Sequence, residues 1–179
     1  MAQTQRYGSL SISMHWLMLI LMAAVYLCIE LRVLYPKGTD PREALKMWHF
    51  MLGLVIFALV WIRLLARLFS HNPTITPAPA NWQLLIAKIA HLALYAFMLG
   101  MPILGWLVLS ASDKPVPFFG LSLPALIAPN ETLAKELKEL HEIIGTLGYW
   151  MIGLHAVAAL AHHYIRKDNT LIRMLPSRA

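Results

Sequence analysis

Residues 141–165 read HEIIGTLGYWMIGLHAVAALAHHYI, and this stretch decides the fold. From Ile143 to Ile165 it holds 23 residues without a formal charge, and a helix that crosses a bilayer needs about 20 largely apolar residues. Ionisable residues are rare inside such runs and are usually functional. His141 and His155 are 14 residues apart, about 21 Å and nearly four turns along a helix. The stretch therefore predicts a transmembrane helix with two histidines on one face.

Three further apolar runs precede it. Residues 7–29 and 89–112 hold 23 and 24 uncharged residues, the latter around Pro102. The run at 47–62 holds only 16, so it reaches full length only if Arg63 extends to the interface or finds a partner. The polar stretch 131–140 has helical spacing and is expected to run into the last span. We therefore expect an all-α membrane protein, one domain over residues 1–179, folded as a four-transmembrane-helix bundle with approximate spans 8–30, 47–69, 87–111 and 141–165.

Composition narrows the class of protein. The chain is 59% hydrophobic and 13% charged, whereas soluble domains carry about 25% charged residues. Its net charge of +6 comes mostly from residues beside the apolar runs, which indicates contact with membrane lipid and no nucleic-acid partner. Cys28 is the single cysteine, which excludes an internal disulfide, a CxxCH haem attachment and a cysteine-ligated iron–sulfur cluster.

The distribution of charge predicts the orientation. Eight Lys and Arg residues lie on the side that holds both termini and the second connection, against seven on the other side. Eight of the nine acidic residues lie on that other side. Because positive charge favours the cytoplasmic face, we expect both termini in the cytoplasm.

Counting along the helices pairs the histidines by depth. His15 and His155 lie about 13 and 16 Å from the cytoplasmic end of their runs. His49 and His141 both lie at the opposite edge. Imidazole suits iron, and a haem iron accepts two axial ligands, so each pair fits one haem. A lone histidine in a span is often only a hydrogen-bonding group between helices. Zinc, whose ligands converge on one point, and a proton pathway are the alternatives to haem.

Other residues accompany these pairs. Gly53 lies one turn from His49, and Gly148 lies midway between the two histidines of the last span, so both were expected to leave room for a flat macrocycle. Arg63 and Arg67 lie four residues apart and could each pair with a haem propionate by two hydrogen bonds. Arg67 also has the position typical of a basic residue that anchors a helix at the membrane surface.

The sequence resembles the bacterial cytochrome b561 family over essentially its whole length. The likeness is densest at SISMHWL (11–17) and FFGL (118–121), and above all in LGYWMIGLH (147–155), continuing through AHHY (161–164) to KDNTL (167–171). It implies a dihaem cytochrome of the bacterial inner membrane, with axial ligands on helices one and two and two on helix four. The metal-binding residues are then His15, His49, His141 and His155.

The resemblance is greatest to the standalone type described as a superoxide oxidase. It implies two haems b with bis-histidine iron, oxidation of superoxide on the periplasmic side and reduction of ubiquinone. Lys46, Lys114 and Arg32 would attract the superoxide anion. His162 and His91, expected to be shallower than His15, would supply protons to the quinone, bond propionates or hold helices together.

Two other functions remain open at this stage. An electron-transfer subunit would use the same haems to pass electrons between a partner dehydrogenase and the quinone pool. A haem-free transporter or ion-binding bundle would use the histidines differently. The short outer connections and the lack of an attached catalytic domain favour the superoxide:quinone oxidoreductase. His71 and His163 have no assigned role.

Overall fold

The computed structural model describes residues 6–70 and 72–176, so His71 and Arg178 lie outside the described residues. Within that part of the chain there are four long helices, each long and apolar enough to cross a membrane. These are α1 (Ser9–Leu31), α2 (Asp40–Leu68), α3 (Asn81–Ala111) and α4 (Glu131–Tyr164). The predicted four-helix membrane fold is confirmed. Short elements complete the fold: η1 (Arg32–Leu34), β1 (Val116–Phe118), β2 (Leu121–Leu123) and η2 (Ile172–Met174).

Three helices begin well before their apolar runs because helix starts follow capping signals. α2 begins at Asp40 after an extended Thr39, with a proline in its first turn, where the missing N–H costs nothing. α4 begins after Asn130, whose side chain accepts a hydrogen bond from the Leu133 backbone N–H at 3.0 Å. Such a cap satisfies one of the free N–H groups of the first turn. The polar stretch 131–140 is therefore the first part of α4, as expected.

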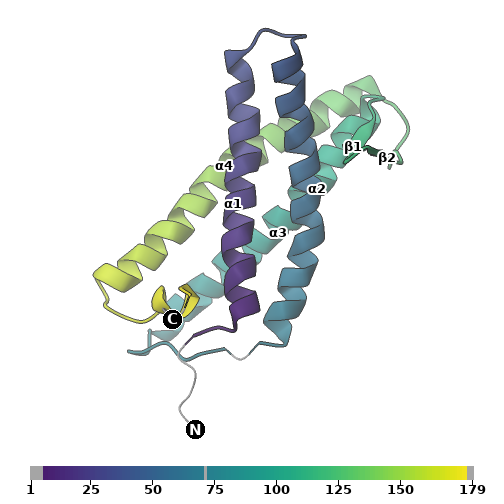
Figure 1. The fold of residues 1–179 in the computed structure, drawn as a ribbon. Coiled ribbons are helices and arrows are strands. Elements are labelled where there is room, and N and C mark those ends of the chain that lie inside the picture. The colour runs from purple at the N-terminus through teal and green to yellow at the C-terminus, as the bar shows by residue number, and fades with distance from the viewer. Residues whose placement is uncertain (1–5, 71, 177–179) are drawn as a thin grey trace.

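The helices form two crossing pairs. In Figure 1, α1 and α2 run side by side, and α3 and α4 lie behind them at a marked tilt. Two small apolar clusters join the pairs. One contains Met18, Ile56, Val60 and Met98 from α1, α2 and α3. The other contains Leu54, Leu109 and Val116, from α2, α3 and β1.

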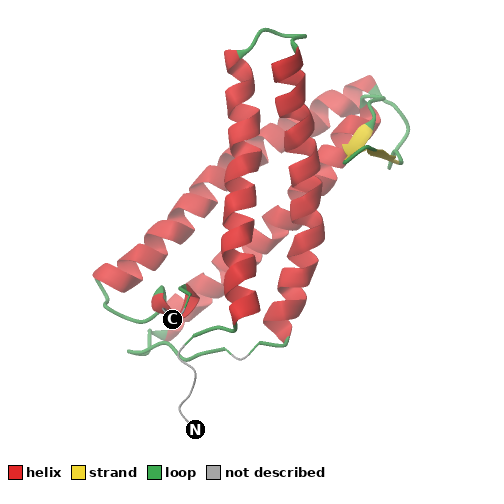
Figure 2. Ribbon diagram, viewed as in Figure 1, coloured by secondary structure: helices red, strands yellow, loops and turns green. Residues whose placement is uncertain are grey.

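The bundle has two distinct ends. The terminal end holds residues 6–8, 69–70, 72–80 and 165–176, and the Tyr7 backbone N–H donates to the Arg173 carbonyl there at 3.1 Å. The hairpin end holds residues 32–39 and 112–130 (Figure 2).

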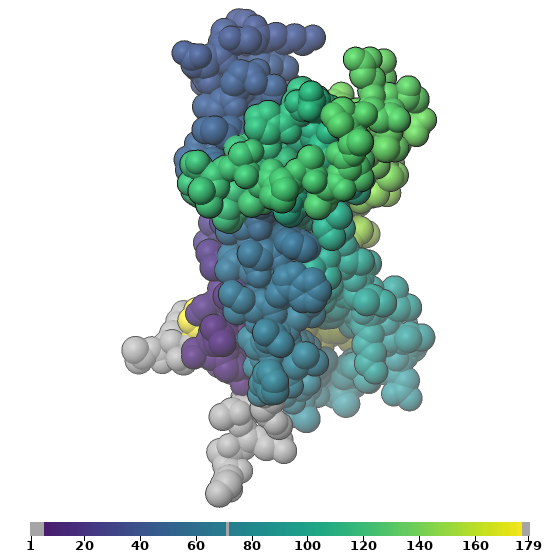
Figure 3. Space-filling view, turned by 90° about the vertical axis from the view of Figure 1, so that its right-hand side faces the viewer, coloured from purple at the N-terminus to yellow at the C-terminus, as the bar shows by residue number. Residues whose placement is uncertain are grey.

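A small hairpin departs from the all-α expectation. Strands β1 and β2 pair antiparallel, with Phe118 opposite Leu121. Between them, Phe119 and Gly120 both have positive φ, at 48° and 85°, as a tight two-residue hairpin turn requires. The Phe119 N–H donates to the Met51 sulfur at 3.4 Å, and Figure 3 shows the green segment lying across the blue upper part of the bundle. The hairpin thus fastens the long connection to α2.

Candidate functional site

Four histidines meet in two pairs inside the bundle. His49 of α2 and His141 of α4 face each other toward the hairpin end, with ring centroids 6.2 Å apart and planes at 75°. His15 of α1 and His155 of α4 face each other toward the terminal end, at 6.1 Å and 70°. The pairing inferred from depth is therefore the pairing found in the structure.

The spacing of each pair fits a shared metal. A metal–imidazole bond is about 2 Å long and the ring centroid lies about 1.2 Å behind the nitrogen, so two imidazoles bound to one metal from opposite sides would have centroids about 6.4 Å apart. The measured separations of 6.1 and 6.2 Å are close to this value. Each pair could therefore give one nitrogen from each ring to the iron of a haem, so the donor set fits haem.

Hydrogen bonds orient the pair at the hairpin end. His49 Nδ1 lies 3.0 Å from the Val25 carbonyl oxygen. A carbonyl only accepts, so Nδ1 carries the proton and Nε2 keeps its lone pair. This arrangement is typical of a metal-ligating histidine. His141 Nδ1 is buried and has no hydrogen-bond partner among the described residues.

The pair at the terminal end has a different neighbour. Arg63 Nη2 lies 3.2 Å from His15 Nδ1, and its guanidinium lies over the Tyr95 ring at 5.9 Å. A guanidinium only donates hydrogen bonds, so His15 Nδ1 is the acceptor here. Arg63 thus lies at the site, as expected, but bonded to a histidine. Arg67 instead lies over the Tyr7 ring at 4.8 Å.

The glycines do not all play the expected part. A Cβ on Gly53 would have nothing within 4 Å, which agrees with open space beside His49. A Cβ on Gly148 would overlap Tyr26 and Phe97, so those side chains fill the space expected for a macrocycle, and the role inferred for Gly148 is not supported. A Cβ on Gly105 would lie 3.3 Å from His141.

Gly105 had not been singled out from the sequence. The absence of a Cβ there lets α3 approach the His141 ring. Its sequence signal was a glycine inside an apolar run, which by itself does not reveal which neighbour comes close.

His91 lies deeper than expected. Its ring centroid is 5.4 Å from that of His155, so it belongs to the level of that pair and not to a shallower layer. The expectation was wrong because it counted residues from Lys88. α3 already begins at Asn81, and crossing helices do not share one scale of depth.

A histidine–aspartate pair lies at the terminal end. His162 Nδ1 is 2.5 Å from an oxygen of Asp168, which is only 3% exposed. The other oxygen of Asp168 accepts from the Thr170 N–H at 2.9 Å. Burial disfavours the charged carboxylate, but the hydrogen bonds from His162 and Thr170 outweigh burial and hold the pKa of Asp168 below its usual value.

Sequence reasoning missed Asp168 because it follows the end of α4 and so belongs to no helical pattern. The signal that could have found it was the KDNTL stretch, which carries part of the family resemblance. His163, which follows His162 on α4, packs its ring edge-on against that of Tyr164, with the ring centroids 4.7 Å apart.

The segment around Asp168 is tied to the rest of the terminal end. Asn169 accepts a hydrogen bond from the Thr76 N–H at 2.9 Å. The buried Arg173 donates to the Pro73 carbonyl. The Trp16 indole N–H of α1 donates to the Met174 carbonyl at 2.8 Å. These bonds hold residues 168–174 against α1 and the segment 73–76, which fixes the position of Asp168.

The expected basic residues at the hairpin end differ in their surroundings. Lys46 forms an ion pair with Glu43 at 2.6 Å, which reduces the positive field it can offer to an anion. Lys114 is exposed and lies three residues after the end of α3. Of these two, Lys114 is the freer cation.

Together, the membrane bundle and its two imidazole pairs define a class of protein suited to carry one flat metal cofactor at each of two levels. The chain belongs to the family described as prokaryotic cytochrome b561, whose model matches residues 6–177. Members of this family are membrane electron-transfer proteins that bind haem b, generally two. The chain is therefore a bacterial membrane protein, and the haem-free transporter is no longer an alternative.

Individual relatives agree with this assignment. The chain is 36% identical to "Cytochrome b561 homolog 1" of Escherichia coli (strain K12), over 97% of this chain and 98% of that protein. It is 37% identical to "Probable superoxide oxidase CybB" of Yersinia pestis, also over 97% and 98%. It is 30% identical to "Cytochrome b561 homolog 2" of E. coli (strain K12), over 96% and 92%.

The Asp168 carboxylate predicts a dependence of stability on acid pH. Its pKa in the folded protein is lower than the ordinary value of 3.8. The stabilisation is therefore present above pH 3.8 and is lost as pH falls through the folded-state pKa. Asp168→Asn should remove this part of the pH dependence. Thermal unfolding in detergent from about pH 3 to pH 7 measures it. The exposed Glu139→Gln is the control, and equal acid sensitivity of wild type and Asp168→Asn would contradict the prediction.

Proposed function

We propose that this protein is a superoxide:quinone oxidoreductase that holds two haems b, one between His49 and His141 and one between His15 and His155. The observation that carries the proposal is the pair of centroid separations, 6.2 and 6.1 Å, on imidazoles from different helices. The printed name of the Yersinia pestis relative, a probable superoxide oxidase, supports the choice of reaction.

Haem iron supplies reversible one-electron transfer. With each haem held by one histidine pair, both axial positions would be filled, so superoxide and quinone would exchange electrons with the cofactor without binding the iron. Each superoxide gives up one electron and leaves as dioxygen. Two such electrons and two protons convert one quinone to quinol. The chain's tasks are to attract an anion at one end and deliver protons at the other.

Proton delivery falls to the terminal end. Asp168 accepts a hydrogen bond from His162 Nδ1, so the ring is held with its Nε2 side available to a quinone. Nε2 can then act as a proton donor to the quinone. His91, beside His155, is a second group at this end.

Binding of iron by His15 involves Arg63. The nitrogen that binds the metal carries no proton, so the other ring nitrogen must carry it. Arg63 donates to His15 Nδ1 in this structure, and that bond is incompatible with a proton on Nδ1. Arg63 is then released to pair with a carboxylate, such as a haem propionate.

A specific surface favours a second candidate function. Trp48, Phe119 and Leu121 are 44%, 54% and 68% exposed at the hairpin end, and the rings of the first two lie 6.2 Å apart. This apolar patch suits a partner dehydrogenase that would deliver electrons to an electron-transfer subunit. Rapid mixing of the purified chain with superoxide and ubiquinone separates the candidates, because only the first needs no protein partner.

The ligand assignment predicts selective loss of haem. His49→Ala or His141→Ala should remove the haem near the hairpin end, and His15→Ala or His155→Ala the other, lowering the haem-to-protein ratio from about two to about one. Pyridine haemochrome assay and redox titration measure the content and identify which haem is lost. His163→Ala is the control and should keep both. Four variants that each retained two haems would refute the assignment.

The proposed orientation places both termini in the cytoplasm and the hairpin end in the periplasm of the inner membrane. Reporter fusions test it: alkaline phosphatase fused after Ala179 should be inactive, and green fluorescent protein at the same point should fluoresce. A matched fusion in the 32–39 loop should give the reverse. Active phosphatase after Ala179 would invert the two ends.

The direction of electron flow gives the next prediction. Added salt should slow haem reduction by superoxide, because attraction of an anion to Lys114 and its neighbours is screened. His162→Ala should leave that reduction unchanged and slow haem reoxidation by quinone by about 10²-fold, the usual loss of a general acid. Stopped-flow absorbance measures both steps. His163→Ala should reoxidise normally, and normal reoxidation of His162→Ala would refute the role of His162.

A further inference from the structure

Three cations lie on the turn between α1 and α2 and on the first turns of α2, ahead of His49, and two of them are engaged. Lys46 is ion-paired with Glu43 at 2.6 Å. Arg42 donates to the Arg32 carbonyl at 3.0 Å and to the Tyr35 carbonyl at 2.8 Å. A guanidinium bonded to two backbone carbonyls closes the turn between α1 and α2. Both side chains therefore already have partners within α2 or in the turn.

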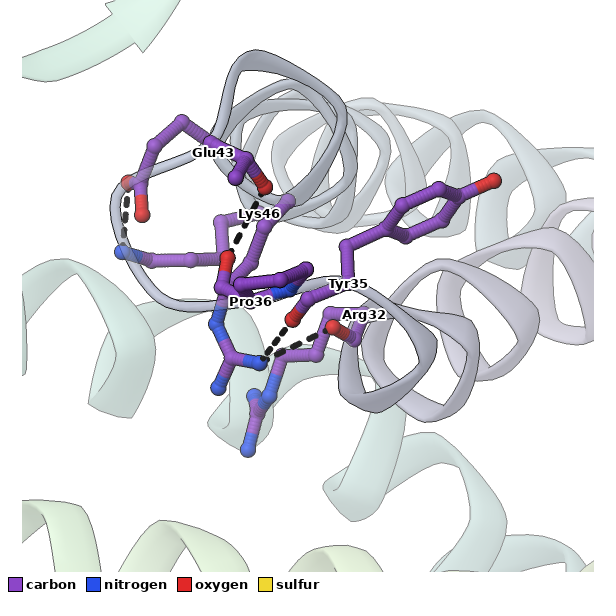
Figure 4. A network of polar contacts seen from close by, with 7 residues as sticks. Arg32, Tyr35, Pro36, Glu43 and Lys46 are labelled. Carbon is purple, nitrogen blue, oxygen red and sulfur yellow. Dashed lines mark hydrogen bonds and ion pairs between the residues drawn. The ribbon is translucent and has the colours of Figure 1, made fainter.

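Arg32 is different. Its guanidinium makes no hydrogen bond and no ion pair to a described residue, and in Figure 4 it points away from the Glu43–Lys46 pair with no dashed line. The side chain is only partly exposed. A half-buried guanidinium with five unused donors is suited to bind an oxyanion by two parallel hydrogen bonds.

We propose that Arg32 is the docking residue for the small oxyanion that delivers electrons beside His49, and that Arg42 positions it through the backbone of the turn. The inference rests on the proposed function, in which that oxyanion is superoxide. Superoxide loses one electron and becomes neutral dioxygen, with no bond broken and no proton moved. The guanidinium attracts the charged substrate and not the neutral product, so the product leaves readily. Lys46, which the sequence favoured, is replaced in this role.

A phospholipid phosphate would present the same chemistry to Arg32. An apolar cavity of about 310 Å³ lies nearby, lined by residues that include Leu34, Tyr35 and Trp48, and could take an acyl chain. Arg32 does not line it, and in Figure 4 the Tyr35 ring and the Arg32 guanidinium point to different sides. The geometry therefore favours a small free anion over a lipid headgroup.

The experiment compares substitutions that each remove one positive charge from the same loop region. Haem reduction by superoxide is followed by stopped flow in phosphatidylcholine nanodiscs. Arg32→Gln should slow it about tenfold or more, as expected for loss of a charged hydrogen bond. The exposed Lys37→Gln is the matched control, and it and Lys46→Gln should stay within about twofold of wild type. Arg32→Lys keeps the positive charge but lacks the planar N–H groups that bind an anion by two parallel hydrogen bonds, so its rate of haem reduction should be intermediate.

Two further measurements distinguish a loss of anion binding from a loss of haem or of the fold. Haem content and reduction by dithionite should be unchanged in every variant. Nitrate at constant ionic strength should inhibit the wild type and not Arg32→Gln. Arg42→Gln should still be inhibited by nitrate, but only at higher concentration, because its effect acts through the placement of Arg32.

Each contrary outcome is informative. Equal rates for Arg32→Gln and Lys37→Gln would overturn the docking role while leaving the proposed function intact. Nanodiscs with phosphatidylglycerol that slow the wild type to the rate of Arg32→Gln would show that Arg32 holds a lipid phosphate, which also overturns it. A wild type that superoxide does not reduce, although dithionite does, would overturn both the inference and the proposed function.

Discussion

The interval of 14 residues between His141 and His155 on α4 is the constraint on which the rest of the structure depends. A continuous helix is stiff, and it holds the two imidazoles about 21 Å apart on one face. Each imidazole then needs a partner from another helix at a matching level, which α2 supplies with His49 and α1 with His15. α3 and α4 lie at a tilt to the first two helices, and Gly105 lets α3 come close to the ring of His141.

Apolar surroundings make every polar group of the site depend on a partner. The backbone carbonyl of Val25 fixes the ring of His49, and the Asp168 carboxylate fixes that of His162. The two anchors lie at opposite ends of the bundle and orient rings with different proposed tasks. His49 is proposed to bind a metal, and His162 is proposed to deliver a proton.

The sequence was sufficient for features that repeat along a helix and insufficient for features that arise between helices. Uncharged runs predicted four helices. The interval on the last helix, together with residue counts from the helix ends, predicted the neighbours His15–His155 and His49–His141, whose rings lie together in the structure. The same counting failed for His91 because the helices cross at an angle. The packing of Tyr26 and Phe97 against Gly148 is a contact between helices that spacing along one helix does not reveal. Asp168 follows a helix end, and the freedom of Arg32 depends on which neighbouring charges are already paired, so neither has a pattern in the sequence.

The packing around Gly148 has a consequence for the membrane as an insulator. Gly148 lies halfway between the two histidines of α4, and Tyr26 and Phe97 press against it from α1 and α3. The Tyr26 hydroxyl is already satisfied, because it donates to the Gly145 carbonyl at 2.7 Å. Aromatic rings therefore fill the bundle between the two histidine levels. With haems bound at both levels, electrons would pass between them through packed side chains, and the same packing would oppose a chain of water molecules that could carry protons across the membrane.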